Sequence, residues 1–272
     1  MTSATLNAAV EMQHISYSQI SMFDKCELSW YLKYVKGIAK PATIPMILGK
    51  AYHSALALNF RQKIHTAEDL PAEEVITEFT SSLIESISAE CIQVPENKSI
   101  EDYTEPVERL LTHYIDTYAP GMQPLLVEQP LEKNIVGCNR KIVGILDLLT
   151  QEGILVDFKL SGKRFSQSDE SAARQIDTYI LLLEQMLTGE LHVALKNNKK
   201  PAVQIVQFER TRDDILKFKE HLKDVCLAME ALEAGNKAPS TCTGFCSDKM
   251  CSYWTECQEY KASKLMESSY AY

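Results

Sequence analysis

The stretch "GILDLLTQEGILVDFK", residues 144–159, contains two aliphatic runs separated by a short polar break. Aliphatic and β-branched runs bounded by turn residues predict a β-hairpin. If residues 151–153 form a three-residue loop with the glycine in the left-handed conformation, antiparallel pairing places Asp147 across from Asp157. The hairpin then brings two carboxylates together.

The second strand of this hairpin carries a lysine beside one of the acids. Side chains alternate along a strand, so Asp157 and Lys159 share one face while Phe158 points to the other, into the core. Two acids this close repel unless a cation neutralises them, and a hard divalent ion with oxygen ligands does so at neutral pH. A lysine beside such an ion can stabilise charge on a phosphate or hold an attacking water. The spacing equally allows a salt bridge between Asp157 and Lys159 with Asp147 merely solvated.

Periodic patterns on both sides of the hairpin predict the rest of the fold. Apolar residues at helical spacing predict helices at about 18–36, 47–64, 72–91, 100–118, 169–188 and 211–235. Ser18 and Ser168 are the expected caps of the first and fifth helices, and Gly37 and Gly189 their expected stops. Further strands are expected at 123–132, 139–150 and 201–209. A largely helical first half followed by strands indicates an α/β fold.

Landmarks around the hairpin occur in a set order. They are "SYSQISMFDKCELSWYLKYVKGI" (16–38), "GKAYHSAL" (49–56), "GILDLL" (144–149), "DFK" (157–159) and "QIDTY" (175–179). D-x-K alone arises often by chance, whereas the ordered set in matching strand and helix contexts is far more specific. In these motifs the chain resembles the PD-(D/E)XK nuclease superfamily, specifically its RecB-like, CRISPR-associated-type exonuclease branch, from about residue 15 to 258.

The resemblance implies a fold and a domain organisation. It implies a mixed central sheet flanked by helices, with a helical N-terminal portion and a C-terminal iron–sulfur clasp. A flexible N-terminus is expected at 1–14 and a tail at 259–272, around a single nuclease domain at 15–258. The parts expected within that domain are a helical portion (15–122), the catalytic sheet core (123–210) and a helix with the cysteine-rich clasp (211–258).

The resemblance also implies a metal site around the hairpin. Mg²⁺ or Mn²⁺ is expected there, with His53, Asp147, Asp157 and the main-chain carbonyl of Phe158 as ligands. Lys159 is expected to act on the attacking water or on the phosphate. Glu128, in "LVEQPL", is an expected auxiliary acid.

Gln175 and Tyr179 match the Q-x-x-x-Y helix motif of the branch and are expected catalytic residues. They lie one helical turn apart on one face, so they can contact DNA or brace Lys159 together. Plainer interpretations stand beside these roles. The ring of Tyr179 also fits a helix core, and a lone histidine such as His53 is more often a packed helix residue.

Four of the eight cysteines fall within residues 242–257, "CTGFCSDKMCSYWTEC". The first residues show no signal-peptide pattern, so we expect the cytoplasm of a prokaryotic cell or a virus-infected host cell, where thiols stay reduced. Metal or cluster ligation is then favoured over disulfides. The spacing C-x3-C-x4-C-x5-C lacks the C-x2-C pair common in zinc sites, which makes zinc the less favoured occupant.

Iron–sulfur members of the branch join one N-terminal cysteine to three near the C-terminus. The resemblance therefore implies a 4Fe–4S cluster held by Cys26, Cys246, Cys251 and Cys257. The expected trio is C-x2-C-x5-C, and the wider first gap in this chain leaves Cys242 as the alternative to Cys246. The remaining cysteines are expected to be buried or bystander thiols: Cys91, Cys138 and Cys226.

The net charge of −9 argues against a general nucleic-acid binder, so contacts to DNA must be local. Lys163, Arg164 and Arg174 are the expected DNA-binding residues, and "KNNKK" (196–200) is a second basic loop. A solvated face is the default interpretation of such charges. No stretch approaches the roughly 18 apolar residues of a membrane span, so no membrane association is expected.

Together these features predict a metal-dependent DNA exonuclease that hydrolyses phosphodiester bonds in single-stranded DNA or at DNA ends. The expected setting is recombination, repair, replication or CRISPR adaptation, with DNA and recombination, helicase or CRISPR adaptation proteins as partners and with oligomers allowed. Two alternatives stay open. One is a non-catalytic DNA-binding or recombination partner subunit that keeps the nuclease fold, and the other is a zinc-stabilised adaptor.

Overall fold

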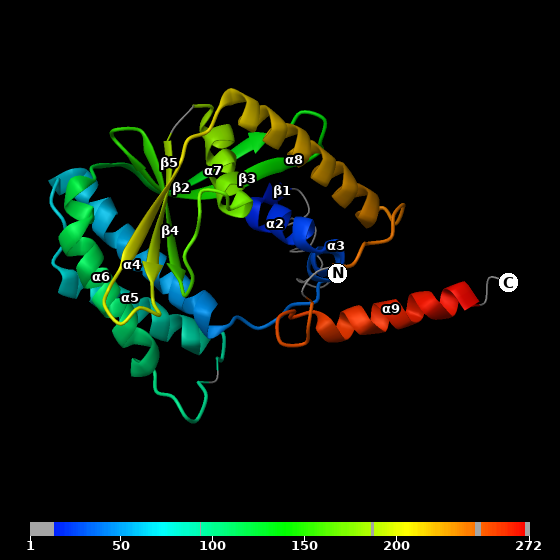
Figure 1. Ribbon diagram of the computed structural model, residues 1–272, viewed down its shortest axis with the longest axis horizontal. Helices are drawn as coiled ribbons and strands as arrows, with labels where there is room; N and C mark the ends of the chain where they lie inside the picture. The colour runs from blue at the N-terminus through cyan, green and yellow to red at the C-terminus, as the bar shows by residue number, and fades with distance from the viewer. Residues whose placement is uncertain (1–13, 93, 186–187, 243–245, 270–272) are drawn as a thin grey trace. The chain divides into compact units, whose positions relative to one another are not determined.

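The computed structural model describes residues 14–92, 94–185, 188–242 and 246–269 (Figure 1). The chain forms two compact units. As far as the structure describes these ranges, unit 1 comprises Met1–Lys40, Glu132–Val143 and Leu216–Tyr272, and unit 2 comprises Pro41–Leu131 and Gly144–Ile215. The segment expected to be flexible, 1–14, lies outside the described residues except for His14. The single nuclease domain stays a prediction.

Unit 2 combines a helical layer with strands. Its helices are α4 (Ile44–Thr66), α5 (Ala72–Ala89), α6 (Glu101–Thr117), the short 3₁₀ turn η2 (Ala119–Gly121) and α7 (Glu170–Leu183). Its strands are β4 (Ile154–Ser161), β5 (Thr188–Leu195) and β6 (Val203–Phe208). Two further strands, β2 (Pro124–Asn134) and β3 (Lys141–Thr150), contribute residues to both units.

The strands form one mixed sheet. Together with β1 (His14–Ser16), they pair in the order β1-β3-β4-β5-β6, and β2 also pairs with β3. β1–β3 and β4–β5 are parallel, whereas β3–β4 and β5–β6 are antiparallel. The α/β fold with a mixed sheet flanked by helices is thereby confirmed.

The hairpin of β3 and β4 has the predicted loop and register. Gly153, the last loop residue, adopts φ +80°, a left-handed conformation that costs little only for glycine. Leu148 pairs with Val156, and the same register continued by one residue puts Asp147 across from Asp157. The sequence prediction of two facing carboxylates is correct at the level of the backbone.

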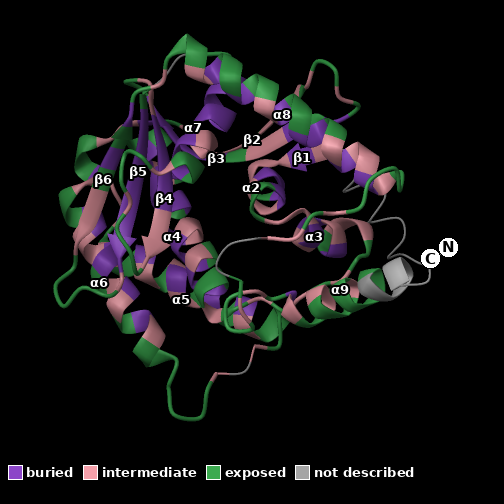
Figure 2. Ribbon diagram, turned by 45° about the vertical axis from the view of Figure 1, so that its right-hand side comes forward, coloured by how far each residue is buried: buried purple, intermediate pink, exposed green. Residues whose placement is uncertain are grey.

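The core of unit 2 lies between the helices α4, α5 and α6 and one face of the sheet. Phe60 of α4 stacks on Phe158 of β4 with ring centroids 5.9 Å apart, and Tyr114 of α6 meets Phe158 edge-on at 5.7 Å. Because side chains alternate along β4, Asp157 faces the opposite side, where α7 lies. In Figure 2 β5 is almost entirely purple, whereas β4 is purple in its middle and pink towards its end.

The prediction for residues 169–188 is wrong at its C-terminal end. α7 ends at Leu183, and β5 pairs with β4 along its whole length and is almost entirely buried. The buried polar residues Glu190 and His192 interrupt the apolar run that identifies a strand covered on both faces. Gly189 does not stop a helix: it lies in β5, where an added Cβ would collide with Ile176 of α7.

Two helices begin one or two residues away from their predicted caps. Asp169 rather than Ser168 caps α7, and Ser16 rather than Ser18 caps α2 (Tyr17–Lys25). In both cases the cap side chain accepts the N–H of the third residue that follows it. This is the usual N-cap geometry, in which an oxygen satisfies an otherwise unpaired helix donor.

The predicted helix 18–36 is interrupted at Cys26. This residue has an extended backbone, with φ −167° and ψ 106°, between α2 and α3 (Glu27–Trp30). A π-helical turn, η1 (Tyr31–Val35), follows α3. Because of this break, the side chain of Cys26 does not follow the helical spacing of the residues around it.

Unit 1 also contains most of α8 (Arg212–Glu233) and all of α9 (Trp254–Ser269), which includes most of the predicted tail. Cys138, in the turn between β2 and β3, forms a disulfide with Cys226 of α8, with Cα atoms 6.1 Å apart. Cys226 is buried, as one of the two predicted alternatives has it, but the pair is a disulfide and not two thiols. The sequence did not signal this bond, because its members are 88 residues apart and no local pattern links them. None of the described helices has the length and apolarity needed to cross a bilayer.

Candidate active site

The two hairpin carboxylates are buried and fixed in place. Asp157 is 1% exposed and Asp147 is 7% exposed. The backbone N–H of Phe158 donates to Oδ2 of Asp147 at 2.9 Å, so the side chain of Asp147 bonds directly to β4. Because Phe158 is packed in the aromatic core, this bond anchors Asp147 to a rigid strand.

α4 and β2 bring two more groups to Asp147. Nδ1 of His53 lies 3.3 Å from Oδ1 of Asp147. One ligand atom from each of His53, Glu128 and Asp147 lies within 4.8 Å of the other two. The ring of His53 also meets Phe158 edge-on, with centroids 6.3 Å apart. One imidazole and two carboxylates therefore converge at the hairpin.

Glu128 has a backbone conformation that residues with a side chain rarely adopt. Its φ is +46°, within β2. Such conformations cost about 1–3 kcal/mol and cluster at functional sites. From the sequence, Glu128 was expected only as an auxiliary acid, and nothing in the local pattern signals the positive φ. The structure places it beside His53 and Asp147.

β4 and α7 supply the contacts of Asp157. Nζ of Lys159 lies 2.7 Å from Oδ2 of Asp157, and Nε2 of Gln175 donates to Oδ1 at 2.5 Å. The same amide donates to Oη of Tyr179 at 3.3 Å, and that hydroxyl donates to the main-chain oxygen of Ile145 at 2.9 Å. Gln175 thus contacts Asp157, and Tyr179 links Gln175 to β3.

Acidic groups dominate the electrostatics of the site. Burial and the charge of Asp147 raise the pKa of Asp157, against the opposing effect of Lys159. Burial, with the charge of Asp147, also raises the pKa of Glu128. Burial alone would lower the pKa of His53, but its hydrogen bond to Asp147 and the nearby carboxylate charges raise it. Carboxylic acids and a histidine whose pKa values are all raised indicate an excess of negative charge, which a bound cation stabilises.

The donor atoms fit a divalent metal ion. Carboxylate oxygens are the usual ligands of Mg²⁺ and Mn²⁺, and imidazole is a common ligand of transition-metal ions. His53, Glu128 and Asp147 already bring one such atom each into a common space. Asp157 faces Asp147 across the hairpin. The main-chain carbonyl of Phe158 stays a predicted ligand.

Two basic loops of unit 2 lie side by side beyond β4. The N–H of Lys196 donates to the carbonyl of Ser161 at 3.0 Å, and Nδ2 of Asn197 donates to the carbonyl of Gly162 at 3.5 Å. These contacts join the loop after β4 to the loop between β5 and β6. Ser161 is two residues beyond Lys159, about 7 Å along a strand.

We call the exposed cations of these two loops the basic patch: Lys163, Arg164, Lys199 and Lys200. Two of them were predicted to contact DNA, and the structure adds the second loop to them. Arg174, the third predicted residue, lies on α7 and forms an ion pair with Glu170 at 2.7 Å.

Three of the predicted cluster cysteines lie together in unit 1. Cys26, Cys251 and Cys257 pack around a small apolar cluster that includes Tyr253. The hydroxyl of Tyr253 donates to the carbonyl of Ile38 at 3.0 Å, which ties the C-terminal cysteine segment to the N-terminal one.

The other two candidates are close to the same group. A hydrogen bond with Cys242 raises the pKa of Cys246 to about 11, and the charges of Cys251 and Cys26 add to the rise. Thiols that oppose one another's ionisation are a donor set that iron or zinc stabilises. The 4Fe–4S cluster stays a prediction, and the choice between Cys242 and Cys246 stays open.

One ion pair next to the site was not predicted. Arg210 donates from Nε and Nη2 to the two carboxylate oxygens of the buried Asp177, at 2.6 and 2.8 Å. This bidentate pair ties α7, which carries Gln175 and Tyr179, to the chain after β6. The only signal in the sequence is an acid among the apolar residues of α7.

Comparison with known proteins gives a family and a fold. The sequence profile of the PD-(D/E)XK nuclease superfamily matches residues 14–258. No curated protein matches significantly. A crystal structure of a provisionally named exonuclease from Eubacterium rectale has a similar fold, with a TM-score of 0.60 and 12% identity over 93% of this chain and 91% of that one. The crystal structure of SSO0001 gives a TM-score of 0.31, with 15% identity over 56% of this chain and 86% of that one.

The profile spans the elements that hold the site, from the first strand to the last cysteine of the clasp. It includes α4 with His53, the hairpin with Asp147, Asp157 and Lys159, and α7 with Gln175. The structural likeness, at low identity, independently supports the fold. This chain belongs to the PD-(D/E)XK nuclease superfamily.

Proposed function

We propose that the chain is a metal-dependent DNA exonuclease of the RecB-like branch. The observation that carries the proposal is the convergence of His53, Glu128 and Asp147 at a hairpin whose other strand presents Asp157 and Lys159. A nuclease superfamily makes nucleic acid the substrate class. The arrangement of acids and lysine suits hydrolysis of a phosphodiester bond.

Each group has a part in this proposal. When bound, Mg²⁺ or Mn²⁺ supplies Lewis acidity and favours deprotonation of an attacking water. His53, Glu128, Asp147 and Asp157 hold the ion. The ammonium group of Lys159 stabilises negative charge on the phosphate or orients the water. Gln175 keeps the carboxylate of Asp157 in one orientation, and Tyr179 fixes Gln175 to β3.

The basic patch is the proposed path for the DNA strand. Its first residue, Lys163, is four residues from Lys159, at most about 14 Å along the chain, and a strand of B-form DNA advances about 3.4 Å per nucleotide. Its cations therefore reach phosphates within a few nucleotides of the scissile bond. A handful of such contacts in an acidic protein gives local, salt-sensitive binding, as expected for a single strand or a strand end.

The clasp of unit 1 completes the proposal. Cys26, Cys251, Cys257 and either Cys242 or Cys246 hold a 4Fe–4S cluster that links the N- and C-terminal segments of this unit. The cluster belongs to a different unit of the chain from the acids of the hairpin, so we assign it a structural role.

The test is cleavage of 5′- and 3′-labelled single-stranded oligonucleotides with Mg²⁺ or Mn²⁺ by anaerobically purified protein. Wild type should shorten the strand only with metal, and the surviving label gives the polarity. Asp157→Asn removes one ligand charge and should be at least about 100-fold slower.

Asp116→Asn makes the same chemical change at an exposed site on α6 and should cleave like wild type. Absence of cleavage by folded wild type, with DNA still bound, would contradict the proposal and favour the non-catalytic DNA-binding subunit. A colourless protein that retains zinc would instead favour the zinc-stabilised adaptor.

A further inference from the structure

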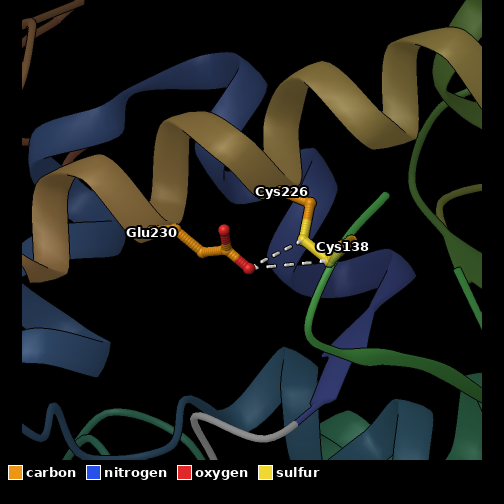
Figure 3. Close-up of side chains that lie close together, drawn as sticks. All are labelled: Cys138, Cys226 and Glu230. Carbon is orange, nitrogen blue, oxygen red and sulfur yellow. Dashed lines mark hydrogen bonds between the residues drawn. A yellow bond between two sulfur atoms is a disulfide. The ribbon is translucent and has the colours of Figure 1, made fainter. Parts of the chain in front are cut away.

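A second cluster of ligand-type side chains lies in unit 1, apart from the clasp cysteines in the sequence. Cys138 is in the β2–β3 turn, and Cys226 and Glu230 lie one turn apart on α8 (Figure 3). Ligand atoms of these three residues lie within 4.8 Å of one another. No part of the proposed nuclease chemistry uses them.

The carboxylate of Glu230 is directed at both sulfur atoms. Its Oε1 lies 4.0 Å from Sγ of Cys138 and 3.8 Å from Sγ of Cys226. The backbone N–H of Asn139 donates to the same oxygen at 3.2 Å, which holds the carboxylate over the pair. In Figure 3 both sulfurs face this one oxygen.

The disulfide alone does not account for this arrangement. A disulfide sulfur carries no proton, so in the oxidised pair neither S···O contact is a hydrogen bond. In the reduced pair both thiols can donate to Glu230, or can lose their protons to solvent and bind a cation as thiolates. The two contacts between Glu230 and the sulfur atoms can therefore be hydrogen bonds, or be bridged by a shared cation, only when the disulfide is reduced.

We propose that Cys138, Cys226 and Glu230 bind a thiophilic divalent cation, zinc, when the cysteine pair is reduced. Zn–S bonds of about 2.3 Å and Zn–O bonds of about 2.1 Å at the tetrahedral angle place sulfur and oxygen about 3.6 Å apart. The observed contacts of 3.8 and 4.0 Å are close to that separation. Only the two sulfurs have to move apart, to about 3.8 Å.

The helix contributes two of the three ligands at a suitable spacing. Residues four apart, such as Cys226 and Glu230, lie on the same helix face and can bind one ion together. Cys138 is half-buried whereas Cys226 is fully buried, so a reductant or an ion reaches the pair from the side of the turn. A water molecule can take the fourth position.

The chemistry balances with a dithiol reductant. The dithiol gives two electrons and two protons to the Cys138–Cys226 disulfide and itself becomes a disulfide. Each of the two thiols then loses its proton to solvent as it binds zinc. Thiolates prefer zinc to Mg²⁺ or Mn²⁺, so the ligand set also separates this site from that of the hairpin.

The experiment compares zinc content in reduced and oxidised protein whose clasp is loaded with iron. Protein treated with a phosphine reductant is dialysed against zinc in a competing chelator, and zinc and iron are counted per chain. Reduced wild type should hold one more zinc than Cys226→Ser and one more than oxidised wild type. Glu230→Gln keeps both sulfurs and should bind this zinc at least about tenfold more weakly.

Cys91→Ser is the matched control, because it removes an exposed free cysteine outside the cluster. It should hold as much zinc as wild type. Cobalt in place of zinc should give a thiolate charge-transfer band in wild type and Cys91→Ser that is weaker in Cys226→Ser.

Equal zinc in reduced wild type and in both Cys226→Ser and Glu230→Gln would overturn the proposal. If thiol counting then shows two new thiols on reduction, the pair is a disulfide only. Should Cys226→Ser fail to fold, the comparison of wild type with Glu230→Gln still decides.

Discussion

At the scale of single residues, the orientation of Asp157 depends on a side chain from a neighbouring helix. Gln175 donates a hydrogen bond to Oδ1 at 2.5 Å, while Lys159 forms an ion pair with Oδ2 at 2.7 Å that lacks hydrogen-bond geometry. Tyr179 keeps the amide of Gln175 in place through a bond to the backbone of β3. If Asp157 is a metal ligand as proposed, these contacts preorient its carboxylate, which is what a metal site requires of the groups behind its ligands.

Gln175→Met should lower kcat about 10- to 100-fold, because a hydrogen bond to a charged group contributes about 1.5–3 kcal/mol. Methionine keeps the length of the side chain and removes the donor, so the fold should survive. Tyr179→Phe should have a smaller effect, since its hydroxyl does not touch Asp157. The measurement is single-turnover cleavage with saturating metal, with circular dichroism as the check on folding.

Gln151→Met, in the exposed hairpin loop, is the control for the same substitution. Full activity of Gln175→Met would show that the amide has no positioning role.

Residues whose roles depend on local spacing were predictable. Asp147 and Asp157 face each other because three loop residues set the register, and that information lies within the hairpin itself. The place of Glu128 was not predictable, because it depends on a positive φ within β2 that no neighbouring residue signals.

At the scale of elements, β5 connects the helical layer of unit 2 to its sheet by polar bonds as well as by packing. His192 contacts the hydroxyl of Tyr114 at 2.7 Å through Nδ1 and the carboxylate of Glu190 at 2.9 Å through Nε2. Gln207 of β6 donates to the other oxygen of Glu190 at 2.8 Å. If Nε2 carries the proton, the histidine donates to Glu190 and accepts from Tyr114, so every group is satisfied.

The close approach of α7 to β5 gives a prediction for Gly189. Gly189→Ala should lower the free energy of unfolding by about 1–3 kcal/mol, because the new methyl group collides with Ile176 and forces α7 outward. Ile176→Ala in the same chain should recover part of the loss. Urea unfolding followed by circular dichroism measures both.

Gly49→Ala on α4 is the matched control, because nothing lies within 4 Å of a Cβ at that position. It should stabilise the chain slightly, since alanine is the better helix former by about 1 kcal/mol. Equal effects at the two glycines would contradict the packing argument.

The network around Glu190 gives a prediction for acid conditions. The hydrogen bond from His192, with the one from Gln207, lowers the pKa of Glu190 below its usual value of 4.5. A lowered folded-state pKa means that the stabilising contribution is complete above the unfolded pKa and is lost as the pH falls through the folded one. Glu190→Gln should therefore be less stable than wild type near neutral pH, and the difference should shrink below pH 4.5.

Urea unfolding of wild type and Glu190→Gln at several pH values checks this. Glu85→Gln, at an exposed position on α5, should show no such trend. A difference that stays constant down to acid pH would mean that the charge of Glu190 is not involved.

The predictions of secondary structure were wrong at two places, the backbone break at Cys26 and the buried strand β5. Apolar residues keep their helical spacing on both sides of Cys26, so nothing local signals its extended backbone. β5 is buried almost throughout although it contains Glu190 and His192, so its sequence does not show the apolar run of a buried strand, and its glycine resembled a helix stop. Both errors arise because tertiary packing outweighed local pattern.

At the scale of the whole molecule, residues far apart in the sequence hold unit 1 together. Cys138 and Cys226 are 88 residues apart, and Tyr253 bonds Ile38 from a C-terminal segment. The order of motifs was enough to predict the fold class and the hairpin, and the roles proposed for the site residues stay predictions. Pairings over such distances were not predictable, except for the clasp that the family resemblance implies.

Cys26→Ser should lose the iron and much of the stability of unit 1, because one ligand of the proposed cluster is missing. The readout is iron per chain and the brown colour of anaerobically purified protein, with Cys91→Ser as the control. Cys242→Ser and Cys246→Ser then identify the fourth ligand, since only one of them should lose iron. A folded Cys26→Ser protein with its full iron content would reject the assignment.

The division of unit 1 among three chain segments has a consequence for biosynthesis. All residues of unit 2 have been made once Ile215 has left the ribosome, whereas unit 1 also needs the segment that begins at Leu216. Domains of a growing chain tend to fold as they emerge, so unit 2 can fold first while the N-terminal segment of unit 1 waits for partners. Until those partners arrive, the apolar residues of α2 and α3 are exposed to proteases and chaperones, which makes unit 1 the vulnerable part of the nascent chain.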